Sequence, residues 1–307
     1  MTRRGTVVVT SRSFGDGSSD PAAALADHGL AVARGPADHD PAALAPLLRD
    51  AVGWIAGAGP VADEHLRLAP VLRIVARYGT GVDAVDVAAA RRRHVVVTNT
   101  PGANAGAVAE HTIALMLACL RHIVAADRHV RAGRWPVVRG RELGASTVGL
   151  VGFGDVGRRV AAIVHGFGGT VVVHDPFVDA AGVTSLALDA LLERADVVSL
   201  HCPPTAAPVI TAGALRRMRP GAVLVNTARA SLLDEDAVAA ALRRGSLGAL
   251  GSDVLSGSAA LLAAPRTVFT PHCAAQTDQA IDRMGHAAVA EVLRVVIHRT
   301  APLHRVA

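Results

Sequence analysis

The 307-residue chain contains no lysine, because all 31 of its basic residues are arginines. Enzymes that form a Schiff base or hold pyridoxal phosphate need a lysine amine, and so does the phosphate loop of the P-loop nucleotide hydrolases. The composition therefore excludes these classes. Tyr78 is the single tyrosine, so reductases that depend on a tyrosine and lysine pair are excluded as well.

Cysteine is also scarce. Cys119, Cys202 and Cys273 are odd in number and far apart, with no CxxC spacing, so neither a disulfide framework nor a structural zinc site is expected. The 14 histidines form no HExxH motif or comparable ligand cluster, and no metal is predicted. Reduced thiols fit the cytoplasm.

Aromatic residues make up only 3% of the chain, and the arginines are scattered, with the longest run at Arg91–Arg93. The net charge of +5 therefore indicates a solvated surface rather than a nucleic-acid site. The most apolar stretch, 112–120, is shorter than the about 20 residues of a spanning helix. The apolar run Val7–Val9 is too short for a signal peptide. We expect a cytoplasmic protein that binds neither nucleic acid nor membrane.

Short β-branched runs alternate with Ala- and Leu-rich stretches, a pattern typical of βαβ units and parallel sheets. The predicted fold class is α/β, and the length favours two domains. Helices are predicted to begin at Asp20-Pro21 and Asp40-Pro41, and one long helix is predicted from about 105 to 131. A last helix is predicted at 279–297. Strands are predicted near 6–10, 54–56, 73–76, 95–98, 147–151, 171–174, 197–200, 222–226 and 249–254. Between the later strands, helices are predicted at 156–167, 188–194, 212–218 and 235–244.

A glycine-rich motif follows the strand predicted at 147–151. Gly152, Gly154 and Gly157, with Asp155 and Val156 between them, would allow a tight turn and close approach of backbone amides to a pyrophosphate. The next predicted strand ends at Asp175, where a carboxylate can accept both ribose hydroxyls. No arginine follows Asp175 closely to hold a 2′-phosphate. The motif therefore predicts a site for NAD rather than NADP.

Two side chains suit acid and carboxylate chemistry. Arg229 lies just past the carboxyl end of a predicted strand and can bind a carboxylate through two hydrogen bonds. His272 follows Thr270-Pro271 in what we expect to be an apolar setting, and histidine exchanges protons near neutral pH. Hydride transfer at C2 of a 2-hydroxy acid needs such a pair. Taken singly, each residue is explained about as well without catalysis, Arg229 as a surface arginine and His272 as a histidine of the core.

The chain resembles the D-isomer-specific 2-hydroxyacid dehydrogenases, the family that includes phosphoglycerate dehydrogenase, over nearly its whole length. The resemblance is carried by RYGTGVDAVDVAAA (77–90), VTNTPGANAGAVAEHT (97–112), VGLVGFGDVGRRVA (148–161), MRPGAVLVNTARASLLDEDAV (218–238) and TPHCAAQT (270–277). It implies two flavodoxin- or Rossmann-like domains with parallel sheets and an active site in the cleft between them. The substrate domain would comprise 1–98 plus 272–307, and the NAD-binding Rossmann domain 99–271.

By the same resemblance, Arg229 would hold the substrate carboxylate and His272 would be the acid and base. Backbone amides of Thr80 and Gly81 would bind the other face of the carboxylate. Further residues would line the cofactor beside the glycine-rich motif and Asp175: Thr112, Cys202, Pro203, Thr227, Ala228 and Asp253. The helix after Ala105 and the segment 131–141 would form an arm that packs on a second subunit, giving a homodimer.

One departure from the family pattern stands out. Members carry a catalytic glutamate five residues beyond the aspartate that matches Asp253, and that position here is Ser258. No acidic residue occurs between Asp253 and Gln276, so the loop is shortened and the glutamate is lost. The glycine that usually follows the catalytic arginine is Ala230.

The sequence therefore predicts an NAD-dependent oxidoreductase that interconverts a 2-hydroxy acid of the D configuration and its 2-keto acid. Two alternatives follow from the lost glutamate. The chain could be an NAD(H)-binding regulatory protein or pseudoenzyme of the same fold, or a dehydrogenase for a specialised substrate such as a phosphonate.

Overall fold

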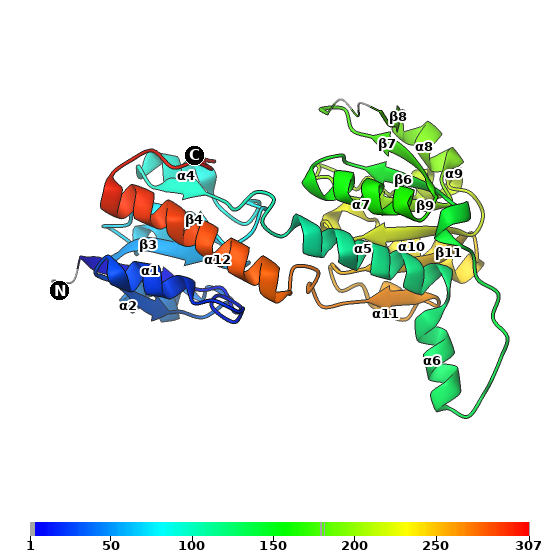
Figure 1. Ribbon diagram of the computed structural model, residues 1–307, viewed down its shortest axis with the longest axis horizontal. Coiled ribbons are helices and arrows are strands. Elements are labelled where there is room, and N and C mark those ends of the chain that lie inside the picture. The colour runs from blue at the N-terminus through cyan, green and yellow to red at the C-terminus, as the bar shows by residue number, and fades with distance from the viewer. Residues whose placement is uncertain (1–3, 179, 181, 307) are drawn as a thin grey trace. The chain divides into compact units, whose positions relative to one another are not determined.

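The computed structural model describes residues 4–178, 180 and 182–306. The chain divides into two compact units, Met1–Asn104 with Ala275–Ala307, and Ala105–Ala274 (Figure 1). This division assigns 99–104 to the first unit and 272–274 to the second, a few residues from the boundaries expected from the sequence.

The described part of the first unit holds one parallel sheet with the strand order β2-β1-β3-β4-β5, the flavodoxin-like order. Its strands are β1 (Gly5–Val9), β2 (Leu30–Arg34), β3 (Ala51–Ala56), β4 (Ile74–Arg77) and β5 (Val96–Thr98). Its helices are α1 (Pro21–Asp27), α2 (Pro41–Leu48), α3 (Asp63–Arg67), α4 (Val87–Arg92) and α12 (Asp278–Leu293), the last followed by a π-helical turn (Arg294–His298). As predicted, Asp20 and Asp40 cap α1 and α2, and each is followed by proline.

The second unit contains the parallel sheet β12-β11-β10-β9-β6-β7-β8, which is the doubly wound Rossmann order with one further strand. Its strands are β6 (Thr147–Val151), β7 (Thr170–His174), β8 (Thr184–Ser185), β9 (Val197–Leu200), β10 (Ala222–Asn226), β11 (Leu247–Ser252) and β12 (Thr267–Phe269). Its helices are α5 (Ala105–Leu120), α6 (Ile123–Arg131), α7 (Asp155–Gly166), α8 (Leu188–Arg194), α9 (Ala212–Arg217), α10 (Glu235–Arg244) and α11 (Ala259–Leu262). The prediction of two α/β domains with parallel sheets is confirmed.

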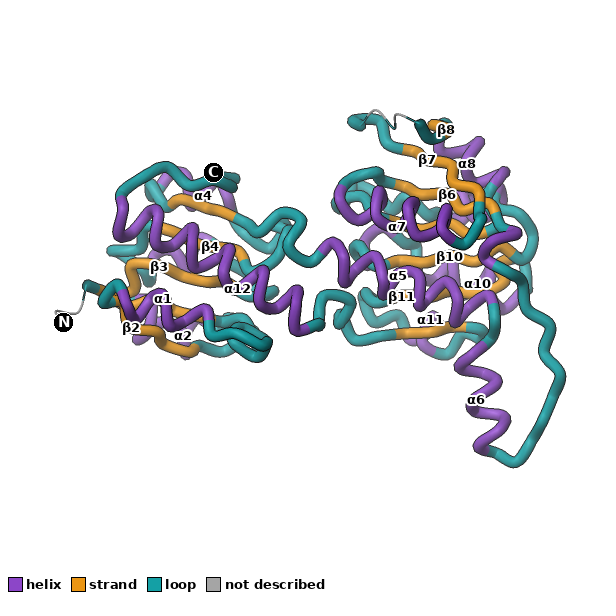
Figure 2. Tube along the Cα trace, viewed as in Figure 1, coloured by secondary structure: helices purple, strands orange, loops and turns teal. Residues whose placement is uncertain are grey.

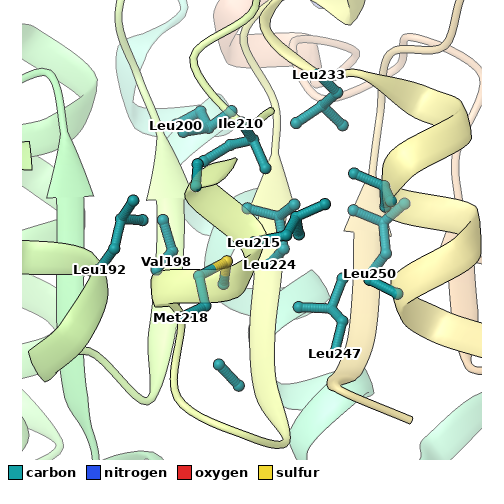
Figure 3. Close-up of a cluster of buried hydrophobic side chains, with 14 of the residues drawn as sticks. Leu192, Val198, Leu200, Ile210, Leu215, Met218, Leu224, Leu233, Leu247 and Leu250 are labelled. Carbon is teal, nitrogen blue, oxygen red and sulfur yellow. The ribbon is translucent and has the colours of Figure 1, made fainter. Parts of the chain in front are cut away.

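Apolar side chains cover both faces of this second sheet, with helices packed on each face (Figure 2). One core lies between the sheet and α5 and α7. The other lies between the sheet and α8, α9 and α10, and Figure 3 shows its leucines and Met218 filling the space between strand and helix. The two cores hold the strands rigidly, so the loops at their carboxyl ends have a fixed base.

The prediction of one continuous helix over 105–131 is wrong. His122 adopts a left-handed backbone conformation with φ of 54°, which ends α5 and turns the chain by 60° into α6. In the described part of the chain no single helix is long and apolar enough to cross a membrane. These two helices reach the required length only together.

Candidate functional site

The glycine-rich loop joins β6 to α7 at the point where the strand order of the sheet reverses. Gly152 has φ of +98°, and a Cβ there would lie 2.6 Å from the backbone of His201 and 2.7 Å from that of Cys202. A Cβ on Gly157 would clash with the carbonyl oxygen of Gly152. Gly154, at the N-cap of α7, faces open space instead. The loop thus has the tight turn, the close helix packing and the open amide face that a pyrophosphate needs.

Asp175 follows β7, and its carboxylate links the glycine-rich loop to the end of this strand. Its Oδ2 accepts the amide of Phe153 at 2.8 Å, and its Oδ1 accepts the amide of Phe177 at 2.9 Å. Burial raises the pKa of the neighbouring Cys202 thiol, and the charge of Asp175 raises it further. Cys202 is therefore a neutral thiol, which is consistent with a lining residue and not with a nucleophile.

Thr112 and Thr227 meet through their hydroxyl groups, 2.9 Å apart. Thr112 is fully buried and also donates to the carbonyl of Val108 at 2.7 Å. Thr112 would therefore not contact a bound cofactor directly but would orient the hydroxyl of Thr227. The remaining residues predicted for the cofactor reach the surface of this unit: Asp155 and Pro203 are exposed, and Val156, Thr227 and Ala228 are half-buried.

Arg229 is positioned by Asn226, a fully buried residue at the end of β10 that the sequence analysis did not single out. The Asn226 amide nitrogen donates to the carbonyl of Arg229 at 2.8 Å, and its oxygen accepts the amide of Ala228 at 3.0 Å. The guanidinium of Arg229 donates to the carbonyl of Ala228 at 2.8 Å and is half-buried. A single buried side chain therefore shapes the turn that carries the arginine.

Asp253 follows β11 and is 1% exposed. Its carboxylate accepts the hydroxyl of Thr270 at 2.6 Å and the amides of Cys273 and Ala274, both at 2.9 Å. His111 of α5 lies on the other side of Thr270, with its Nε2 2.9 Å from the threonine hydroxyl. Asp253 thus fixes the backbone of the segment that carries His272.

His272 itself turns the chain, with φ of 55°, and its amide donates to the carbonyl of Asp253 at 2.9 Å. The apolar setting expected for it is wrong, because the chain leaves β12 at Phe269 and both Pro271 and His272 are exposed. An exposed imidazole is available to an incoming substrate.

These groups surround a cavity of about 380 Å³ within the second unit. Its lining brings together the predicted arginine, histidine and aspartate: Arg229, Ala230, Asp253, Val254, Leu255, Thr270, Pro271 and His272. Among these described residues Asp253 is the one acid, and its oxygens already accept three hydrogen bonds.

The loop at the position of the lost glutamate is held by α10. Glu235 is 7% exposed, and its carboxylate accepts the amides of Ser256 at 2.6 Å and Ser258 at 3.0 Å. The Ser258 hydroxyl donates to Asp236 at 2.7 Å and caps α11 by accepting the amide of Leu261. The hydrogen bonds of Ser258 therefore stabilise the loop, and Ser258 does not line the cavity described above.

Thr80 and Gly81 belong to the first unit, in the loop after β4. Gly79, with φ of +130°, exchanges hydrogen bonds with Thr100, and the Asn99 side chain donates to the carbonyl of Thr80 at 2.8 Å. Within the described part of the chain, no residue accepts a hydrogen bond from the amides of Thr80 and Gly81.

Comparison with known proteins adds a family assignment to this geometry. Residues 113–274 match the model of the NAD binding domain of D-isomer specific 2-hydroxyacid dehydrogenases. A D-3-phosphoglycerate dehydrogenase of Mycobacterium leprae is 41% identical over 256 residues, which cover 79% of this chain and 48% of that protein. The chain thus spans about half the length of the phosphoglycerate dehydrogenases that it matches.

Other relatives are covered more fully. A hydroxypyruvate reductase of Thermotoga maritima is 34% identical over 253 residues, covering 78% of this chain and 83% of the relative. A crystal structure of a Thermus thermophilus protein superposes with a TM-score of 0.90 at 35% identity, covering 98% of this chain and all of that one. Both matches extend well beyond the domain that binds the dinucleotide.

Proposed function

Because the chain belongs to the D-isomer specific 2-hydroxyacid dehydrogenase family, we propose that it interconverts a D-2-hydroxy acid and its 2-keto acid with NAD(H). The observation that carries the proposal is the cavity whose lining includes both Arg229 and His272, two residues far apart in the sequence. A binding protein would need neither a guanidinium nor an imidazole at this place.

The residues around the glycine-rich loop fit the dinucleotide of this proposal. Gly154 faces open space at the start of α7, where the first amides of the helix would meet the pyrophosphate, and the Asp175 carboxylate after β7 would accept the ribose hydroxyls. When bound, NADH supplies a hydride to C2 of the keto acid. Thr227, Cys202 and Pro203 would line the remaining surface of the cofactor.

The chain itself supplies charge and a proton. The Arg229 guanidinium would bind the substrate carboxylate through two parallel hydrogen bonds and would polarise the adjacent keto group. The His272 imidazolium would give its proton to the keto oxygen during reduction, and the neutral imidazole would remove it during oxidation. Asp253 and Thr270 hold the backbone of this segment and so fix the position from which the His272 side chain extends.

We propose that the first unit binds the other face of the substrate carboxylate. The amides of Thr80 and Gly81 are available donors at the carboxyl edge of its sheet, and we assign them to the substrate carboxylate. The loop after β3, Ala56 to Pro60, has no cationic side chain, which disfavours a phosphorylated substrate.

A second candidate is a regulatory NAD(H)-binding protein of the same fold. It is favoured by the loss of the glutamate and by the hydrogen bonds that tie Ser258 to Glu235 instead of to the cavity. A specialised substrate, such as a phosphonate, is the remaining alternative for an altered loop.

We further propose a homodimer in the cytoplasm. Apolar side chains on α6 and the following segment are strongly exposed, with Trp135 at 81% and Val137 at 101%. Such a surface is typical of a protein interface. The free cysteines Cys119, Cys202 and Cys273 fit a reducing compartment.

A panel of 2-keto acids tests the proposed function. Each acid is mixed with NADH and the purified protein, and oxidation is followed at the nicotinamide absorbance. We expect turnover with at least one small 2-keto acid. NADH binding without turnover across the panel would contradict the dehydrogenase and favour the regulatory protein.

A further inference from the structure

Three side chains that are distant in the sequence converge beside the cavity. They are His111 of α5, Asp253 after β11 and Cys273 after β12. Their ligand atoms, the imidazole nitrogen, a carboxylate oxygen and Sγ, all lie within 4.8 Å of one another. The His111 Nε2 and the Asp253 Oδ1 are 3.7 Å apart. The 3.7 Å separation is close to that between two ligands of one tetrahedral metal ion, and Cys273 would complete the set by moving its side chain toward them.

The donor set has a chemical preference. A nitrogen, a sulfur and an oxygen donor together suit Zn²⁺ and its analogues Co²⁺ and Cd²⁺, whereas Mg²⁺ and Ca²⁺ prefer oxygen alone. A carboxylate has about four acceptor positions. Thr270 and Cys273 occupy Oδ1 of Asp253 and Ala274 occupies one position on Oδ2, so an ion would take the second position on Oδ2.

An ion can reach this cluster from solvent. The His111 side chain is 23% exposed and Cys273 is half-buried, while Asp253 forms the buried floor with 1% of its side chain exposed. A site with three protein ligands keeps one position for water. An ion on the His111 Nε2 would replace the contact of that nitrogen with the Thr270 hydroxyl, 2.9 Å away, while Thr270 would keep its hydrogen bond to Asp253 at 2.6 Å.

We propose that His111, Asp253 and Cys273 bind a Zn²⁺ ion and that the bound ion inhibits the enzyme. Binding releases the thiol proton of Cys273 and forms the metal bonds without any redox change. Cys273 directly follows His272, and the Asp253 carbonyl accepts the His272 amide, so two ligands flank the proposed acid on both sides. An ion held by these ligands would therefore fix the segment that carries His272 and restrict the movement of its side chain toward a substrate.

Metal binding is tested without reference to activity. The chelator-treated full chain is titrated with Zn²⁺ by calorimetry, and Co²⁺ is added separately to observe thiolate-to-cobalt charge-transfer absorption. We expect one ion per chain, and we expect Cys273→Ala to weaken zinc binding by at least about tenfold and to abolish the cobalt band. His111→Gln should weaken zinc similarly. Cys202→Ala, at another half-buried cysteine of the same unit, should bind both ions as the wild type does.

Equal zinc affinity of the wild type and Cys273→Ala, or a cobalt spectrum without a thiolate band, would overturn the site. Thermal unfolding of each variant identifies any that fails to fold. If Cys273→Ala does not fold, folded His111→Gln replaces it, and its cobalt band should require more Co²⁺ to appear than the band of the wild type.

The inhibitory half rests on the proposed function. Zinc should abolish keto-acid reduction by the wild type, a chelator should restore it, and Cys273→Ala should resist zinc. Undiminished turnover of a zinc-loaded, active enzyme would overturn inhibition. If the chain shows no turnover with any keto acid, the dehydrogenase proposal fails, and the cobalt spectrum still decides the metal site.

Discussion

The Oε2 atom of Glu235 accepts a hydrogen bond from the backbone amide of Ser258 at 3.0 Å. Ser258 is the position at which relatives are expected to carry a catalytic glutamate. Its hydroxyl donates to Asp236 and accepts the amide of Leu261 at the cap of α11, so its side chain is directed toward Asp236 and the start of α11. Leu255, at the start of the same loop, lines the cavity with His272. A carboxylate that is to act on the imidazole should therefore be placed at 255.

Leu255→Glu should move the pH at which keto-acid reduction falls to half upward by about one unit, because a nearby carboxylate stabilises imidazolium. The matched variant Ser258→Glu should leave that pH unchanged. It should also lower the stability by about 1 kcal/mol, because the cap of α11 is lost and like charges meet. The pH profile of kcat/KM and chemical unfolding measure the two effects. A shift in Ser258→Glu alone would contradict the position that we assign to this loop.

Arg229→Lys should lower kcat/KM for the keto acid by about 100-fold or more, while the affinity for NADH changes little. Lysine keeps the charge but lacks the planar pair of donors that matches a carboxylate. Steady-state kinetics and a fluorescence titration with NADH separate the two quantities. Arg216→Lys, at an exposed arginine outside the cavity, is the control. A loss of less than about threefold would remove Arg229 from the mechanism.

The wild type should prefer NADH over NADPH by at least about tenfold in kcat/KM, because the Asp175 carboxylate repels a 2′-phosphate. Asp175→Ala should narrow this preference. It should also destabilise the unit, since the amides of Phe153 and Phe177 lose their acceptor. Asp189→Ala, at an aspartate on α8, should change neither the cofactor preference nor the stability of the unit. Equal use of both cofactors by the wild type would refute this assignment.

The proposed dimer should have twice the chain mass of 31.4 kDa in light scattering at micromolar concentration. Trp135→Ala and Val137→Ser should weaken the dimer by about tenfold or more, because each removes a large apolar side chain from the expected interface. Val71→Ser, at a half-exposed valine of the first unit, should leave the mass unchanged. A wild-type protein that is monomeric under these conditions would exclude the arm as an interface.

The parts of this molecule that the sequence predicts well are those in which chemistry and spacing are local. The glycines 152, 154 and 157 lie within one turn, and Asp175 ends the next strand, so strand and helix periodicity was enough to connect them. The two helices capped by aspartate and proline were predicted for the same reason. Family membership, the α/β class and the NAD-binding domain agree with the comparisons. The roles of Arg229, His272, Thr80 and Gly81 stay predictions.

Other features depend on contacts between distant segments. His111, Asp253 and Cys273 come from separate elements, so no spacing rule could have shown that their ligand atoms meet. Glu235 looks like an ordinary first-turn acid of α10, and its bond to Ser258 requires the fold. The break at His122 involves neither glycine nor proline, so the sequence offered no signal for it. The short strands β8 and β12 lack the length that makes periodicity visible.

The last prediction concerns acid stability and His201, which lies beside the glycine-rich loop with its Nε2 2.9 Å from the Ser199 hydroxyl. Burial lowers the pKa of this imidazole to about 4, below its ordinary value of 6.5. Above pH 6.5 the folded and unfolded chains both hold it neutral, so it has no effect there. Between pH 6.5 and 4 the unfolded chain takes up a proton that the folded chain does not. The free energy of unfolding should therefore fall by roughly 2 to 3 kcal/mol across this window.

Urea unfolding at several pH values measures this slope. His201→Gln keeps a hydrogen-bonding group near Ser199 and should flatten the fall, whereas His165→Gln, at an exposed histidine of α7, should keep it. If His201→Gln and the wild type lose stability in parallel between pH 6.5 and 4, another group controls the acid transition.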